Sequence, residues 1–245
     1  MLWNLNGRIL IKNQNLKEIG MLMTRHEMIA GRECYCYEHA DAECLLIQPV
    51  DEYDLKVLDK EVKTIQASAG KPFTLVAFKV GNWNRELAPW LAPPVFGKEA
   101  FGDGAQHTLA FITDRLLPEL ARNGTDTSHC LLGGYSLAGL FALWAGYQTD
   151  LFEGIVAASP SVWFPRWMDY AAERKPFARN IYLSLGDKES RTKNPVMSQV
   201  ADAIRRQHEL LQSQSIATIL EWNPGNHFVH TDKRMAKGFS WLITK

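Results

Sequence analysis

One stretch decides the fold of this chain: Leu131-Leu132-Gly133-Gly134-Tyr135-Ser136-Leu137-Ala138-Gly139-Leu140. Its apolar start predicts a buried strand, and residues 140–145 have the composition of a helix. Ser136 stands between the two, in a turn made of small residues. A turn this sharp strains the backbone, so the positions two residues to either side of the serine need very small side chains. Gly134 and Ala138 meet that requirement.

A serine at a sharp strand-to-helix turn is typical of the nucleophile elbow of α/β-hydrolases. The alternative is a glycine-rich turn in which Ser136 only caps the helix, because serine is a favoured N-cap residue. The strand before Ser136 and the helix after it favour the elbow, since they are the context in which that motif occurs.

Composition excludes several classes of protein. The chain has 245 residues, of which 46% are hydrophobic, and this predicts one α/β domain over residues 1–245. Lys and Arg together total 27, and so do Asp and Glu. The chain has no basic stripe, so a nucleic-acid partner is not expected. No apolar run reaches the ~20 residues of a membrane helix, and the N-terminus does not have the pattern of a signal peptide. We therefore expect a cytoplasmic protein whose four scattered cysteines are reduced structural thiols.

Strand and helix alternate along the chain from residue 44 on. Alternation of this kind predicts a mostly parallel sheet with helices on both faces, the α/β-hydrolase fold, and strand character around residues 34–37 predicts an antiparallel start. Only residues 161–179 separate two of the strands, so no large lid is expected. We expect strands at 44–48, 73–80, before Ser136, 154–159, 180–186 and 216–222, and helices at 54–69, 105–122, after Ser136, 196–212 and 233–243, with a turn at 49–52 and a loop at 81–104.

Functional residues of such a sheet lie just after strand ends, and a serine nucleophile needs a base. Three histidines follow Ser136, and the order nucleophile, acid, histidine favours His227, in the loop after the last predicted strand. His208 lies within a predicted helix and is expected at the surface, whereas His230 is a second candidate or a hydrogen-bond partner. A metal site at the last two histidines is not favoured, because no third ligand lies nearby.

The acid that orients the base is expected after the strand ending at Gly186, where Asp187 and Glu189 both qualify. Local sequence does not choose between them. An oxyanion hole needs two backbone N–H donors, and we assign one to Leu137. The second is expected from Asp51 or Val50, in a loop that contains no glycine.

Two strand-end loops are rich in aromatic residues and predict an open cleft for a bulky or aromatic ester. The alternative is that these residues only cover the sheet edge. Arginines among them are candidates for binding a carboxylate or catecholate group. We assign substrate contacts to Trp83, Arg85 and Trp163, with Trp90, Phe164, Arg166 and Trp167 nearby.

From about residue 44 the chain resembles the putative-esterase family of α/β-hydrolases, which includes catecholate-siderophore esterases, feruloyl esterases and the esterase D type. The matching segments are Gly134–Leu143 at the elbow, Asn84–Pro89, Ser159–Phe164, Gly186–Glu189 and Gly225–His227. The resemblance implies that the acid is the fourth residue of Gly186–Glu189, which favours Glu189. The chain departs from the family pattern in two places: Ala138 replaces a glycine, and residues 49–51 replace the His-Gly or Asp-Gly of the oxyanion loop.

These residues together predict a serine hydrolase that cleaves small-molecule carboxylic esters through an acyl-enzyme. Neither a metal nor an organic cofactor is expected, nor a membrane partner, and the oligomeric state is left open. One alternative is an acyltransferase that uses the same acyl-enzyme. Another is a weakly catalytic binding module on the same fold, which the missing oxyanion-loop glycine favours.

Overall fold

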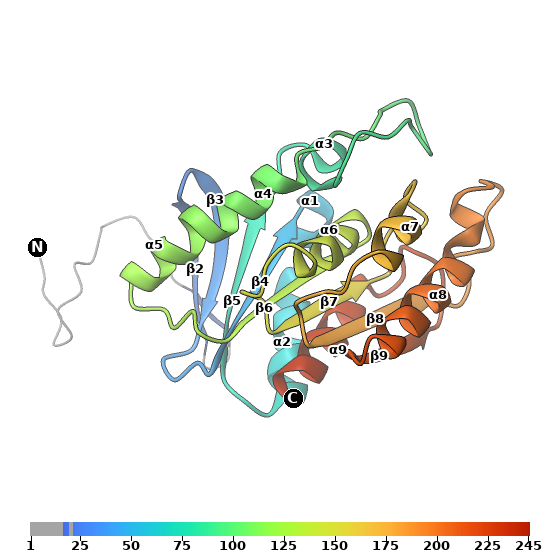
Figure 1. The fold of residues 1–245 in the computed structure, drawn as a ribbon. Coiled ribbons are helices and arrows are strands. Elements are labelled where there is room, and N and C mark those ends of the chain that lie inside the picture. Colours follow the sequence, from blue (N-terminus) through green and yellow to red (C-terminus); the bar gives the residue numbers. More distant parts are fainter. Residues whose placement is uncertain (1–16, 20–21) are drawn as a thin grey trace, which may run out of the picture.

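A nine-stranded sheet organises the part of the chain that the computed structural model describes, residues 17–19 and 22–245 (Figure 1). The strands are β1 (Lys17–Ile19), β2 (Leu22–Ile29), β3 (Arg32–Glu38), β4 (Cys44–Val50), β5 (Phe73–Lys79), β6 (Cys130–Tyr135), β7 (Gly154–Ala158), β8 (Asn180–Gly186) and β9 (Ala217–Asn223). Their order in the sheet is β1-β2-β3-β5-β4-β6-β7-β8-β9.

The first strands form an antiparallel edge and the rest are parallel. Antiparallel pairing joins β1, β2, β3 and β5, and every neighbouring pair from β5 to β9 is parallel. This confirms the predicted mostly parallel sheet and its antiparallel start. Predictions for residues 1–16, 20 and 21 lie outside the described part of the chain.

Helices cover both faces of the sheet and divide the core in two (Figure 1). Side chains alternate across β4: Leu45 and Ile47 pack under one helical layer and Leu46 under the other, because successive residues of a strand point to opposite faces. The helices are α1 (Glu52–Leu55), α2 (Leu58–Ala69), α3 (Trp83–Leu87), α4 (Ala105–Phe111), α5 (Leu117–Arg122), α6 (Leu137–Gly146), α7 (Trp167–Ala172), α8 (Val200–Ser213) and α9 (Thr231–Ile243).

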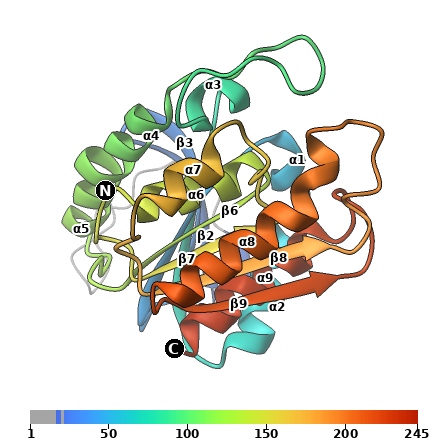
Figure 2. The ribbon, with the colours of Figure 1, turned by 45° about the vertical axis from the view of Figure 1, so that its right-hand side comes forward.

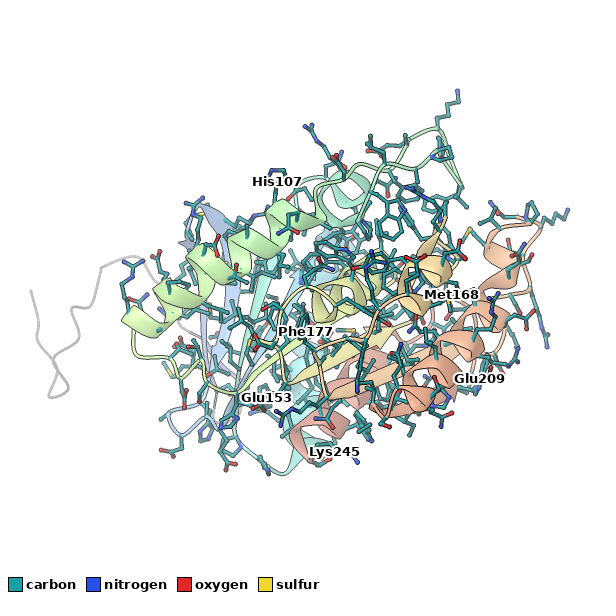
Figure 3. The ribbon with its side chains drawn as sticks, in the orientation of Figure 1. His107, Glu153, Met168, Phe177, Glu209 and Lys245 are labelled. Atoms are coloured by element: carbon teal, nitrogen blue, oxygen red, sulfur yellow. The ribbon has the colours of Figure 1, made fainter. Side chains whose placement is uncertain are left out.

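One layer holds α2 and α9, and the other holds α4 to α8. α8 lies along β8 and β9, with α7 beside it (Figure 2). Exposed side chains such as His107 of α4 and Glu209 of α8 stand on the outer side of their helices (Figure 3). The predicted α/β arrangement with helices on both faces is confirmed.

Several element boundaries differ from the predictions. The helix expected at 54–69 is interrupted into α1 and α2, and the one expected at 105–122 contains a π-helical turn at Ile112–Leu116 between α4 and α5. The loop at 81–104 contains α3, which Asn82 caps by accepting the N–H of Arg85.

The turn expected at Pro49 is wrong, because β4 continues to Val50. Pairing with β6 ends at Ile47, whereas pairing with β5 continues to Val50. Pro49 therefore stands where one side of β4 has no neighbouring strand, and its missing N–H costs the sheet little.

Within the described residues, none of the helices is both long and apolar enough to span a bilayer. All four cysteines are free thiols, and Cys34, Cys36 and Cys130 are buried. Burial raises the pKa of Cys34 to about 12 and that of Cys44 to about 11, so these thiols stay protonated at neutral pH.

Candidate active site

The turn between β6 and α6 has the geometry predicted for a nucleophile elbow. Ser136 has φ 57° and ψ −119°, a conformation that costs a non-glycine residue free energy. A Cβ at Gly134 would lie 2.3 Å from the backbone carbonyl of Ala138, so only glycine fits there. Every residue of α6 is buried, and this packing holds the strained turn in place.

Three side chains from different strand ends form one hydrogen-bonded chain. Ser136 Oγ lies 3.0 Å from Nε2 of His227, and His227 Nδ1 lies 2.7 Å from Oε2 of Glu189. Ser136 follows β6, Glu189 follows β8 and His227 follows β9, because the carboxyl ends of parallel strands meet at one edge of the sheet. The histidine side chain is 25% exposed and the glutamate side chain 4%.

Of the two candidate acids, the structure brings only Glu189 to the histidine ring. Asp187 Oδ1 instead accepts the backbone N–H of Gly225 at 2.8 Å, which ties the loop after β8 to the loop after β9. Burial raises the pKa of Glu189, but the hydrogen bond and charge of His227 and the bond from Ser159 outweigh it, so the pKa lies below its usual value. Glu189 is therefore a carboxylate at neutral pH.

Sequence reasoning missed Arg234, which donates a hydrogen bond to the carboxylate oxygen of Glu189 that His227 does not contact. Its side chain is 1% exposed. On α9 it lies three residues after Thr231 and four before Gly238, on the buried face of the helix. A charged residue at the spacing of that apolar face is the sequence signal that could have revealed it. Its Nη1 donates to Glu189 Oε1 (2.6 Å), Ser159 Oγ (2.9 Å) and Tyr135 Oη (3.0 Å), and its Nη2 to the carbonyls of Asn226 (2.9 Å) and Pro224 (3.3 Å).

The other two histidines lie apart from this chain of bonds. His230 is the exposed N-cap residue of α9, and His208 lies within α8, half-buried rather than fully at the surface. No group of three or more His, Cys, Asp or Glu side chains suited to a metal ion occurs in the described ranges 17–19 and 22–245.

The predicted oxyanion donors differ in their availability. Leu137 is the first residue of α6, where backbone N–H groups have no carbonyl partner within the helix. The N–H of Asp51 is already engaged, since it donates to Asp54 Oδ2 at 3.2 Å. This bond belongs to a capping box, in which Asp51 Oδ1 accepts the N–H groups of Tyr53 (2.6 Å) and Asp54 (2.9 Å).

Ser136 and His227 open onto a cavity of about 320 Å³. Of the three residues expected to contact substrate, Trp83 lines it, whereas Arg85 and Trp163 are not among its lining residues. Trp163 instead packs against Phe96 and Phe101 in a separate aromatic cluster. The cavity is lined by Asp51, Tyr53, Asp54, Trp83, Tyr135, Ser136, His227, Phe228 and Thr231.

The sheet order and the strand-to-helix elbow define this protein as an α/β-hydrolase in fold. Residues 60–229, more than half of the chain, match the model of the putative esterase family. The chain therefore belongs to that family, as its sequence predicted.

Several known proteins are similar to this chain. An uncharacterized protein of Bacillus subtilis (strain 168), YbbA, is 23% identical over 184 residues, which cover 70% of this chain and 73% of that protein. The structure of an IroE-like serine hydrolase from Shewanella oneidensis matches with a TM-score of 0.75 and 16% identity, over 90% of this chain and 80% of that one. The siderophore hydrolase EstB from Aspergillus nidulans matches with a TM-score of 0.65 and 17% identity, over 92% and 96%.

Proposed function

We propose that this protein is a serine esterase that hydrolyses carboxylic esters through an acyl-enzyme. The observation that carries the proposal is the chain of hydrogen bonds from Ser136 through His227 to Glu189, at the edge of a cavity. Membership of the putative esterase family supports the same chemistry. So do the fold relatives described as a serine hydrolase and a siderophore hydrolase.

The first half of the reaction forms the acyl-enzyme. Ser136 Oγ attacks the ester carbonyl while its proton passes to Nε2 of His227, 3.0 Å away. Glu189 accepts the Nδ1–H of that ring and stabilises its positive charge, as the acid of a triad does. When the tetrahedral intermediate collapses, His227 returns the proton to the leaving alcohol, and the acyl group stays on Ser136.

The second half repeats these steps with water. His227 takes a proton from a water molecule as its oxygen attacks the acyl carbonyl, and then protonates Ser136 Oγ as the acid product leaves. The N–H of Leu137 is the first oxyanion donor. For Asp51 to supply the second, its N–H must exchange the carboxylate of Asp54 for the substrate oxygen.

The hydrogen bond from the Asp51 N–H to Asp54 is the observation that favours a second candidate function, a binding module with slow turnover. If the N–H of Asp51 stays with Asp54, one oxyanion donor is missing, which costs about 10²–10³ in kcat. The two functions differ in rate and not in the reactivity of Ser136.

Ser136→Ala tests both functions with purified protein and p-nitrophenyl acetate. Loss of a triad nucleophile lowers kcat by at least ~10³-fold, whereas Asp202→Asn, on the outer side of α8, retains wild-type activity. A fluorophosphonate reports whether the serine is activated. Labelling of Ser136 with slow turnover supports the binding module; no labelling of folded wild-type protein, or activity that survives Ser136→Ala, contradicts both.

A further inference from the structure

Two carboxyl groups lie on the wall of the cavity that holds Ser136. Asp51 and Asp54 both line it, whereas neither lysine nor arginine is among its lining residues. The guanidinium of Arg234 is buried behind Glu189, with which it pairs. The fixed charge of this cavity is therefore negative, opposite to the sign that arginines at its wall would supply.

The capping box explains why positions 51 and 54 carry side-chain oxygens that accept hydrogen bonds, but it does not require those side chains to be acids. Asp51 Oδ1 accepts two backbone N–H groups, and Asp54 Oδ2 accepts the N–H of Asp51. Asparagine is as good an N-cap residue as aspartate, and an amide oxygen accepts the same bonds. Two adjacent acids instead repel each other. Burial and the charge of Asp51 raise the pKa of Asp54 to about 7.

Aromatic rings form the rest of the cavity wall. Tyr53, Trp83, Tyr135 and Phe228 supply them. The Tyr53 hydroxyl donates to the carbonyl of Phe228 at 3.4 Å, which joins α1 to the loop between β9 and α9. Cations are attracted to aromatic rings by about 0.5–2 kcal/mol, and aromatic walls combined with acidic groups are suited to ammonium ligands. An anionic ligand finds neither lysine nor arginine on this wall, and the acids repel it when they are ionised.

Resting on the esterase function above, we propose that the substrate is an ester bearing a protonated or quaternary ammonium group, held by Asp51, Asp54 and the aromatic rings. The carbonyl of the same molecule then lies at Ser136. A positive charge between the two acids relieves their repulsion, so binding stabilises the doubly ionised pair. The proposal replaces the carboxylate or catecholate ligand expected from Arg85 and Arg166.

Binding by the Ser136→Ala variant tests the cation preference without any chemistry. Choline and its uncharged isostere 3,3-dimethylbutan-1-ol have the same shape, and calorimetry compares their affinities. We expect choline to bind at least ~10-fold more tightly, and Asp54→Asn in the same background to reduce that ratio at least ~3-fold. Asp202→Asn removes an equal charge from the outer side of α8 and should leave the ratio unchanged. Equal binding of the two probes overturns the proposal.

Labelling of the wild-type protein tests the same preference at the nucleophile. Two phosphonate esters with these alcohols as leaving groups should react with Ser136 at rates that favour the choline ester, and Asp54→Asn should reduce the preference. Comparable rates for both overturn the ammonium proposal and leave the esterase standing. If neither phosphonate labels Ser136 but choline binds preferentially, the esterase function fails and the cation site stands.

Discussion

Replacement of Arg234 is the perturbation for which the structure makes the most detailed prediction. Arg234→Met keeps most of the side-chain volume and removes five hydrogen bonds and one buried charge. Removing one member of a buried ion pair costs ~3–5 kcal/mol, because the other charge stays buried without its partner. Glu189 still accepts bonds from Gly186, Ser159 and His227, so we expect the lower end, about 3 kcal/mol.

The same substitution should alter the pH dependence of activity. Arg234 opposes the negative charge that Glu189 presents to His227, and both partners are within 2.7 Å of the carboxylate. Without the guanidinium, protonation of His227 becomes more favourable. The acid limb of kcat/KM should therefore move to higher pH. The displacement is about one pH unit for each ~1.4 kcal/mol of electrostatic free energy with which Arg234 disfavours that protonation.

Two measurements check the role of Arg234. Urea unfolding followed by tryptophan fluorescence gives the stability change, and kcat/KM for p-nitrophenyl acetate from pH 5 to 9 gives the acid limb. Arg234→Lys keeps the charge and loses the two-pronged geometry, so it should lower kcat and leave the acid limb where it is in the wild type. An Arg234→Met protein that loses less than ~1 kcal/mol and keeps its acid limb would refute the reasoning. If that variant does not fold, an acid limb displaced in Arg234→Lys refutes it instead.

The remaining predictions concern the elbow, the acid and the acidic cavity wall. Gly134→Ala places a Cβ 2.3 Å from backbone atoms, so we expect a loss of ~3 kcal/mol or more in thermal unfolding, and a loss below ~1 kcal/mol would contradict the packing. Glu189→Gln should lower kcat by ~10²-fold or more and Asp187→Asn by less than ~10-fold, and equal losses would show that the acid is wrongly assigned. The folded-state pKa of Asp54 is about 7 against an ordinary 3.8, so the folded protein binds more protons between about pH 4 and 7 and loses stability as pH rises through that window. Buried Glu61, whose pKa burial also raises, contributes to the same slope, so Asp54→Asn should reduce the slope and not abolish it. The variant should gain about 1–2 kcal/mol at pH 8, less than the ~4 kcal/mol that the full pKa difference would give, because the side chain is partly exposed; no gain at pH 8 relative to pH 5 would contradict it.

The positions of Ser136 and His227, the proposed nucleophile and base, were predictable because both depend on local sequence and chain order. The small residue at position 134 is a steric requirement of the turn, and it can be recognised without knowing what surrounds it. His227 follows the last strand of an alternating α/β pattern, and parallel strands bring all such ends to one edge. The strand and helix boundaries were less predictable where pairing decides them, as at Pro49, which is tolerated because one neighbouring strand has ended.

Tertiary structure decided which of the two candidate acids contacts His227, how that side chain is held and which charges line the cavity. Asp187 and Glu189 are two residues apart and chemically alike, and only the packing of the loops after β8 and β9 sends one to Gly225 and the other to His227. Arg234 lies 45 residues after Glu189 in sequence, so no local pattern joins them. The amino-acid sequence by itself determined which chemical groups stand at the strand ends, because hydrophobic periodicity and the steric limits of turns depend on only a few neighbouring residues. Which of those groups meet depends on contacts between distant segments, and these exist only once the sheet has formed.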